Sequence, residues 1–432
     1  MTRPFLGFYG DDLTGSTDAM EALAARGVPA RLFLDPPDAD DLKSSEPLAA
    51  VGIAGTSRAQ SPGWMRANLP SAFQSLAALG VPLIHYKVCS TFDSAPTIGN
   101  IGTVLDIGLE LFGRAVPIVA GVPELNRFTA FGTLFASFID GQVYRIDRHP
   151  VMSRHPTTPM GEADLVKHLA AQTKTPVDLI DFRVEDIAAR YDAAAKRGVL
   201  IDNLNPVTAL AIGKFLRTLG APGKPAFVIG SSGVEYALLA AMRTYEKRAE
   251  RSLSRPALAV ERLLVLSGSA SPTTARQIAA AVGAGFTLVK ADIAKLAAGS
   301  DDEVRRLAEA ATAALGKSSV IIATAVNPGD VQGSIDASEA GKSLGKAGAL
   351  ILDRLPQIGR VVVAGGDTSS FVARALGVHA LELETEFDRG APLCRATLKS
   401  RHMQILFKGG QLGHEDLFDR VRQGTAAKAA AA

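Results

Sequence analysis

The sequence predicts an α/β protein with two domains, each built on a mainly parallel sheet flanked by helices. Short apolar runs rich in β-branched residues alternate with longer stretches of helical periodicity, which is the pattern of strand–helix–strand units. A length of 432 residues favours more than one domain. Near the middle, residues 246–255 are dense in charge without an apolar period, and Pro256 follows, which indicates a helix end and a linker.

These observations divide the chain into four parts. We expect a first domain at residues 1–245, a linker at 246–260, a second domain at 261–424 and a disordered, alanine-rich tail at 425–432.

The composition excludes several classes of protein. Hydrophobic residues make up 47% of the chain and charged residues 21%, as in ordinary globular proteins, and a net charge of +2 gives no sign of a nucleic-acid or membrane partner. Cys89 and Cys394 form neither a metal spacing nor a disulfide framework. Asp11 and Asp12 interrupt the apolar N-terminal run, so it does not read as a signal peptide, and no apolar run approaches the roughly 20 residues of a membrane span. We therefore expect a cytoplasmic protein.

The first domain begins with a strand–helix–strand unit. Residues 5–9 predict a buried strand, Ser16 or Thr17 can cap the helix that follows, and this helix ends near Gly27. Residues 30–34 predict the next strand, implying a parallel sheet with a right-handed crossover. Further strands are expected at residues 50–54, 83–87, 117–120, 200–202 and 227–230, with helices at 64–78, 162–172 and 185–196.

The second domain repeats the alternation and then changes. Strands are expected at residues 262–266, 286–289, 319–323 and 361–363, with helices at 273–282, 301–315 and 338–354. After Gly377, residues 380–386 and 402–407 predict strands with only a loop and a short strand between them, which is typical of a sheet edge.

Residues 360–377 have the architecture of an anion site. A buried strand is followed by Gly365 and Gly366, and Asp367, Thr368 and Ser369 offer N-caps for a short helix at residues 371–376. Glycines let the backbone approach a ligand closely, and the N–H groups at a helix start point at a phosphate.

Two more small-residue loops follow strands in this domain, at Ser267–Ser271 and Lys408–Gly410. Loops at the carboxyl ends of parallel strands meet at one edge, where ligands bind. Helix capping would explain any one of these loops, but three in one domain favour nucleotide phosphates. The chain contains neither a P-loop nor a Gly-x-Gly-x-x-Gly fingerprint, which argues against a dinucleotide.

In the first domain, Asp11 and Asp12 lie between a strand end and a helix start, with Thr14 beside them. One carboxylate there is an ordinary cap. Two adjacent carboxylates could instead accept hydrogen bonds from a polyol or hold a metal through water.

Three other polar groups stand out in the first domain. Residues 87–94 combine a lysine, three hydroxyls and a carboxylate after a strand. Arg58 and Arg127 lie just beyond strands, where each could bind a carboxylate or be a solvated surface charge. Residues 147–160 hold three prolines and two histidines, typical of an ordered functional loop; the histidines lack the spacing of a zinc pair, so no metal site is predicted.

Six motifs in order make the chain resemble the four-carbon acid sugar kinase family: residues 10–15, 87–93 with 99–102, 153–160, 267–271, 365–369 and 408–413. The resemblance implies that the first domain binds a sugar acid, that the second binds ATP, and that the active site lies in the interdomain cleft. Members phosphorylate the terminal hydroxyl of threonate, erythronate or 3-oxo-tetronate.

The resemblance also implies roles for single residues. Asp12 or Asp11 would accept the proton of the attacking hydroxyl, while Arg58, Lys87 or Arg127 would hold the substrate carboxylate and Mg²⁺ would bridge the phosphates. The full set of substrate-binding candidates is Arg58, Lys87, Ser90, Thr91, Asp93, Arg127, Ser153 and His155. The nucleotide candidates are Ser267, Ser269, Gly365, Gly366, Asp367, Thr368 and Gly410, with Lys408 or the helix start at Thr368 offsetting phosphate charge.

Two departures from the family pattern are visible. Asn126 stands where the family has glycine, which leaves the substrate open, and Gly409, Gln411 and Leu412 replace members of the final motif, which affects adenine or ribose contacts more than phosphate contacts. A non-catalytic sugar-acid sensor is the main alternative, and a nicotinamide dehydrogenase is disfavoured by the missing fingerprint. The sequence leaves the oligomeric state open, with a homodimer as one option.

Overall fold

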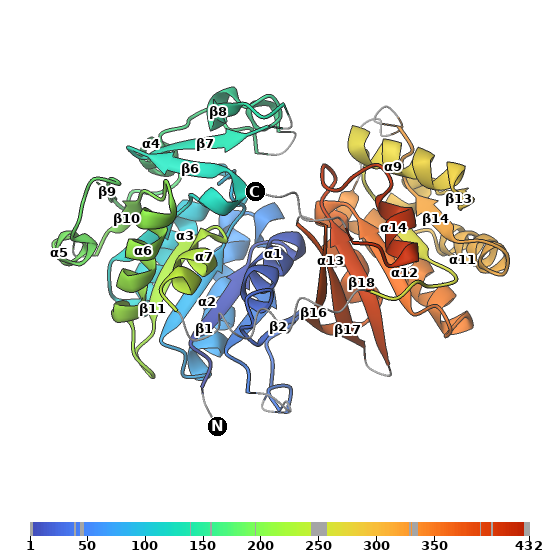
Figure 1. Ribbon diagram of the computed structural model, residues 1–432, viewed down its shortest axis with the longest axis horizontal. Coiled ribbons are helices and arrows are strands. Elements are labelled where there is room, and N and C mark those ends of the chain that lie inside the picture. The colour runs from blue at the N-terminus through green and yellow to red at the C-terminus, as the bar shows by residue number, and fades with distance from the viewer. Residues whose placement is uncertain are drawn as a thin grey trace. The chain divides into compact units, whose positions relative to one another are not determined.

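The computed structural model describes residues 3–38, 40–43, 47–138, 140–155, 158–194, 196–242, 257–327, 330, 336–388, 390–398 and 401–426. The chain forms two compact units (Figure 1). Unit 1 comprises Met1–Arg31 and Asp35–Ala249, and unit 2 comprises Leu32–Leu34 and Glu250–Ala432. Most of the predicted linker, residues 246–256, and most of the predicted tail, residues 427–432, lie outside the described residues.

Unit 1 contains a sheet of seven parallel strands with helices on both faces. In spatial order the strands are β3 (Ala50–Ala54), β1 (Leu6–Gly10), β4 (Leu83–Lys87), β11 (Ala226–Gly230), β5 (Val116–Val119), β10 (Gly198–Ile201) and β9 (Val177–Ile180). The helices are α1 (Leu13–Ala24), α2 (Pro62–Ala78), α3 (Ile101–Phe112), α4 (Leu165–Ala170), α5 (Ile187–Asp192), α6 (Pro206–Leu219) and α7 (Gly233–Ala240). The central strands are buried on both faces, as the parallel arrangement requires.

The two faces of this sheet differ in character. Tyr9, Tyr86 and Phe227 pack around Phe73 of α2 on one face. His85 and Lys87 point to the other face because alternate residues of a strand do, and they meet side chains of α7 and α1 there. One face is therefore an aromatic core, and the other carries buried charge.

A small antiparallel sheet interrupts unit 1 between β5 and β9. It consists of β6 (Arg127–Ala130), β7 (Thr133–Ser137) and β8 (Val143–Arg145), and Figure 1 shows the three strands side by side. Two short 3₁₀ turns follow, at Ile146–Arg148 and Met152–Arg154. These strands are three to five residues long and partly exposed, so they lack the apolar runs by which the other strands were predicted.

Unit 2 has a mixed sheet. In spatial order its strands are β13 (Thr287–Lys290), β14 (Val320–Ala323), β12 (Leu264–Ser267), β15 (Arg360–Ala364), β18 (His402–Lys408), β17 (Ala391–Leu398) and β16 (Val378–Asp388). The first five are parallel, whereas β16, β17 and β18 form an antiparallel meander. The helices are α9 (Pro272–Gly283), α10 (Ile293–Ala297), α11 (Asp301–Leu315), α12 (Ala337–Arg354), α13 (Gly366–Ala375) and α14 (Leu417–Gln423).

The strand β2 (Ala30–Phe33) has an antiparallel neighbour that the expected strand–helix–strand unit did not include. Leu32 and Phe33 pair antiparallel with Leu381 and Ala380 of β16, and Leu32–Leu34 is grouped with unit 2. The apolar pattern predicts the strand but not its partner, because pairing is set by tertiary contacts.

Two helix starts were predicted wrongly. Helix α1 begins at Leu13 and is capped by Asp12, while the hydroxyls of Ser16 and Thr17 donate to carbonyls of the preceding turn. Helix α13 begins at Gly366, five residues earlier than expected, after Gly365 at φ +130° and with no side-chain cap. Asp367, Thr368 and Ser369 therefore lie inside the helix and are not its caps.

Helix α13 packs closely on α12 through glycine. A Cβ atom placed on Gly345 of α12 would lie 2.5 Å from the Cβ of Ala375 and 3.0 Å from the Cα of Val372. This close contact fixes the position of α13, and of the loop at Gly365 that precedes it, on α12.

Among the described residues, no helix is both long and apolar enough to cross a membrane.

Candidate functional site

Three parallel strands of unit 1 bring the predicted sugar-acid residues to one edge. Gly10, at the end of β1, is in register with Ala54 of β3 and with Lys87 of β4. The loops that follow are joined by backbone hydrogen bonds, from Asp11 N to Lys87 O at 2.9 Å and from Arg58 N to Asp11 O at 3.1 Å. The parallel arrangement therefore brings four side chains to one edge of the sheet, namely those of Asp11, Asp12, Arg58 and Lys87.

Asp12 is fully engaged. Its Oδ1 accepts from Gly15 N at 2.5 Å as the cap of α1, and its Oδ2 lies 3.3 Å from Nη1 of Arg58. Both carboxylate oxygens thus have donors, one at the N-terminus of α1 and one in the guanidinium of Arg58.

Asp11 has a different environment. Its Oδ1 is buried and accepts no hydrogen bond from the residues that the structure describes. Burial, reinforced by the charge of Asp12, raises the pKa of Asp11 from 3.8 to about 7 against the opposing effect of Arg58 and Lys87. Adjacent carboxyl groups in different environments are a familiar arrangement for dividing proton-transfer and charge-holding roles.

Asp93 anchors Arg58. Its Oδ2 lies 2.7 Å from Nη2 of Arg58 and accepts from Thr158 Oγ1 at 2.7 Å, and its Oδ1 accepts from Thr91 Oγ1 at 2.5 Å. Burial alone would raise the pKa of Asp93, but Arg58 and the two hydroxyls outweigh it and hold the pKa at about 2. Asp93 is therefore a permanent anion and does not suit the role of proton acceptor.

Lys87 is buried beside the carboxylates. Its Nζ lies 3.2 Å from Oδ2 of Asp18 on α1. Burial lowers the pKa of Lys87, yet the surrounding anions, Asp18 first, raise it above its ordinary value on balance. Gly15 leaves room for this cluster, because a Cβ there would lie 3.2 Å from Lys87 Nζ and 2.9 Å from Asp12 Oδ1.

The loop at residues 147–160 reaches this cluster through Thr158, which the sequence analysis did not single out. Thr158 N and its hydroxyl both lie 3.1 Å from Nδ1 of His155, which brings His155 next to Asp93. A threonine two residues after a proline in an irregular loop carries no distinctive signal in a single sequence.

Three other substrate candidates are not brought into this hydrogen-bonded cluster. Ser153 donates to His149 O at 2.8 Å, a local contact, and Arg127 on β6 donates to Leu125 O at 2.7 Å. Ser90 is partly buried in the loop after β4. Asn126 takes the left-handed conformation at φ +54°, which explains how asparagine replaces the expected glycine there.

The predicted nucleotide loops of unit 2 also meet at one edge. Ser267 of β12 is in register with Ala364 of β15, and Ala364 with Lys408 of β18. Gly268 N donates to Ala364 O at 2.9 Å, and Gly365 N donates to Lys408 O at 2.9 Å. The three loops are thus tied together at their first residues.

Glycines allow these loops to approach each other. A Cβ on Gly268 would lie 2.3 Å from Thr368 Oγ1, and one on Gly410 would lie 2.8 Å from Ser269 Oγ. The N-cap of α13 is Gly365, and among the described side chains none caps this helix start, which suits N–H groups that bind an anion. Ser267 Oγ is buried without a hydrogen-bond partner among the described residues, while the side chain of Asp367 lies outside the described part.

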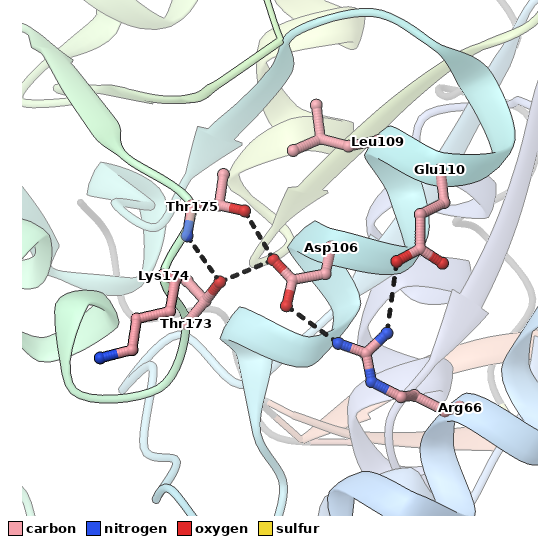
Figure 2. A pocket seen from close by; sticks show the side chains of 7 residues that line it. All are labelled: Arg66, Asp106, Leu109, Glu110, Thr173, Lys174 and Thr175. Atoms are coloured by element: carbon pink, nitrogen blue, oxygen red, sulfur yellow. Dashed lines mark hydrogen bonds and ion pairs between the residues drawn. The ribbon is translucent and has the colours of Figure 1, made fainter.

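A separate hollow of about 300 Å³ lies on unit 1 between α2, α3 and the loop before β9. Figure 2 shows that Asp106 is at its centre, accepting from the hydroxyls of Thr173 and Thr175 and pairing with Arg66, which also pairs with Glu110. Its polar groups are largely satisfied by one another, and it contains none of the predicted site residues.

Comparison with known proteins finds relatives over nearly the whole chain. Residues 6–238 match a family model described as a sugar-binding N-terminal domain, and residues 264–418 match a nucleotide-binding C-terminal domain. A 3-oxo-isoapionate kinase of Paraburkholderia graminis is 43% identical, over 98% of this chain and 95% of its own. A 3-oxo-tetronate kinase of Methylobacterium radiotolerans is 32% identical, over 96% and 98%.

Solved structures show the same fold. A crystal structure from Salmonella typhimurium LT2, labelled as a candidate tRNA synthase, has a TM-score of 0.74 and 26% identity over 97% of this chain and 98% of its own. A Haemophilus influenzae protein has a TM-score of 0.68 and 24% identity over 96% and 98%.

A sugar-binding α/β unit joined to a nucleotide-binding α/β unit defines a carbohydrate kinase. Within that class, the chain belongs to the four-carbon acid sugar kinase family.

Proposed function

We propose that this kinase transfers the terminal phosphoryl group of ATP to the terminal hydroxyl of a 3-oxo acid sugar. Relatives at 43% and 32% identity are named kinases of 3-oxo-isoapionate and 3-oxo-tetronate, so an acid with an oxo group at carbon 3 is the substrate class that both share. The higher identity favours 3-oxo-isoapionate as the first substrate to test. Threonate and erythronate test whether the oxo group is required.

The observation that carries the mechanism is the contrast between Asp11 and Asp12. Asp12 is occupied by Gly15 and Arg58, whereas Asp11 has a buried oxygen with no hydrogen-bond partner among the described residues and a pKa raised to about 7. A general base works best when its pKa lies near the working pH. We therefore assign the role of proton acceptor to Asp11, and to Asp12 the role of holding Arg58 and the start of α1.

The substrate carboxylate would be held by Arg58. A guanidinium has five N–H donors, and the bonds from Arg58 to Asp12 and Asp93 use two of them. Because Asp93 stays ionised, it holds the guanidinium in one orientation, which gives the reacting hydroxyl a defined position.

In unit 2, the start of α13 and the glycines of the three loops would hold the phosphates of ATP. Mg²⁺ would accompany ATP, because this ion keeps several waters and is held mainly by phosphate oxygens.

The test is ADP release from ATP and Mg²⁺ with each of the four acids, followed by ³¹P NMR of the product. The phosphorus of a phosphate on a terminal CH₂ group couples to two protons. The phosphorus of an ester on an internal CH group couples to only one, so the two products can be distinguished. Turnover with none of the acids, combined with binding of one of them, would instead support the sugar-acid sensor.

The variants Asp11→Asn and Asp12→Asn separate the two roles. Loss of a general base costs about 10²- to 10⁴-fold in rate, so Asp11→Asn should lower kcat by that factor with little change in KM for ATP. Asp12→Asn should raise KM for the acid and lower thermal stability. If Asp11→Asn keeps more than a tenth of the wild-type kcat, Asp11 is not the proton acceptor.

A further inference from the structure

Lys408, the last residue of β18, is a fully buried lysine whose partners among the described residues are neutral. Its side chain has 0% exposure, and its Nζ donates to Thr274 Oγ1 at 2.9 Å and to Gly410 O at 3.4 Å. No ion pair involves Lys408 among the described side chains. Lysine is rarely buried completely unless a carboxylate balances it, so this position calls for a functional explanation.

The hydroxyls around Lys408 accommodate either protonation state. Thr274 Oγ1 also lies 3.0 Å from Gly410 O and 3.1 Å from Ser269 Oγ, so its proton has several acceptors. As an ammonium, Lys408 donates to Thr274 and Gly410. As an amine, it can accept the Thr274 proton with its lone pair.

The charged side chains on the strands and helices around Lys408 bond to other partners. Arg276 of α9 pairs with Glu415, Arg360 lies at the opposite end of β15 and bonds Gln404, Arg374 of α13 bonds Leu34 O, and Arg395 of β17 pairs with Glu382. Asp367, near the start of α13, has a side chain outside the described part. Burial lowers the pKa of Lys408 from 10.5 to about 7.

We propose that Lys408 takes up one proton from solvent when a nucleotide binds, which makes nucleotide affinity pH-dependent. This inference rests on the assignment of the nucleotide to unit 2. Phosphate oxygens at the Gly365 and Gly410 loops would supply the anion that the buried amine lacks, and an adjacent negative charge favours the ammonium. The amine lone pair binds the proton, and no other bond changes.

The linkage fixes the sign of the effect. Below pH 7 the lysine is already protonated, so binding takes up no proton there. At pH 8 most molecules carry the amine, so binding takes up close to one proton per nucleotide. Between pH 7 and the pKa that Lys408 has in the nucleotide complex, the dissociation constant of the nucleotide should rise about tenfold per pH unit.

Isothermal titration calorimetry with ADP measures this directly. Titrations at pH 6 and pH 8, each in two buffers of different ionisation enthalpy, give the number of protons exchanged. Wild type should take up close to one proton at pH 8 and almost none at pH 6. Lys408→Met, which matches the length and suits a buried site, should bind ADP at least tenfold more weakly at pH 6 and exchange no proton beyond those of ADP itself.

Equal proton uptake by wild type and Lys408→Met at pH 8 would overturn the proposal, and so would equal ADP affinity at pH 6. Should Lys408→Met not fold, wild-type dissociation constants from pH 6 to pH 9 decide instead, since a flat profile contradicts the linkage. Asp367→Asn is the companion variant: if it produces proton uptake where wild type shows none, Asp367 already balances Lys408 and the proposal is wrong. Absence of ADP binding by wild type at every pH would refute the nucleotide assignment itself.

Discussion

Replacing Asp11 by asparagine should stabilise unit 1 at alkaline pH while it impairs catalysis. Asparagine has nearly the same shape as aspartate but cannot ionise. In the folded protein Asp11 has a pKa raised from 3.8 to about 7, so burying its charged form is unfavourable. Asp11→Asn removes that cost, so the variant measures how much the ionised Asp11 lowers the free energy of unfolding.

The sign and size follow from proton linkage. Between pH 3.8 and about 7 the folded state binds the proton more tightly than the unfolded state, so stability falls as the pH rises and levels off above about 7. The difference between these two pKa values corresponds to at most about 4 kcal/mol in the free energy of unfolding. For a unit of this size, 1 kcal/mol shifts Tm by about 2–4 °C, so Asp11→Asn should gain several degrees relative to wild type on going from pH 5 to pH 8.5.

Differential scanning calorimetry of both proteins at pH 5 and pH 8.5 tests this prediction. Asp12→Asn is the matched control, because it removes a helix cap and an Arg58 partner and should lower Tm at both pH values. A Tm difference between Asp11→Asn and wild type that is the same at both pH values would refute the reasoning, since it would mean that Asp11 is not a high-pKa carboxyl in the folded protein.

Two further predictions concern packing and the ion pair. Alanine usually stabilises a helix by about 1 kcal/mol relative to glycine. In Gly345→Ala, however, the new methyl group would overlap α13, so Tm should fall and calorimetry should show weaker ADP binding. Gly283→Ala is the control, because no atom lies within 4 Å of its new Cβ, and it should change neither Tm nor ADP binding in this way. Asp93→Asn takes the closest anion from the buried Arg58 and should cost about 3 kcal/mol in thermal unfolding and raise KM for the acid substrate. Unchanged ADP affinity in Asp93→Asn is the expected control, and an unchanged KM for the acid would count against Arg58 as its ligand.

Much of the fold could be read from local pattern. The strands at Ala50–Ala54 and Leu83–Lys87 and the helix at Asp301–Leu315 have the predicted bounds, because apolar runs and helical periodicity report burial directly. Helix α3 was missed because its start was interpreted as part of a polar loop, although Asn100 caps it. The antiparallel strands β6–β8 escaped detection because they are short and partly exposed.

The sequence by itself also determined which loops meet. Parallel strands end at a common edge, so the loops carrying Asp11, Arg58 and Lys87 converge, as do those carrying Ser267, Gly365 and Lys408. Only the tertiary structure decided what each side chain does there. Protonation state depends on burial and on partners distant in sequence, and these contacts leave no local pattern. Thus Asp11 and Asp12 are adjacent in the chain yet differ in hydrogen bonding, and the buried Lys408 donates to a hydroxyl that helix α9 supplies, from a residue 134 positions away.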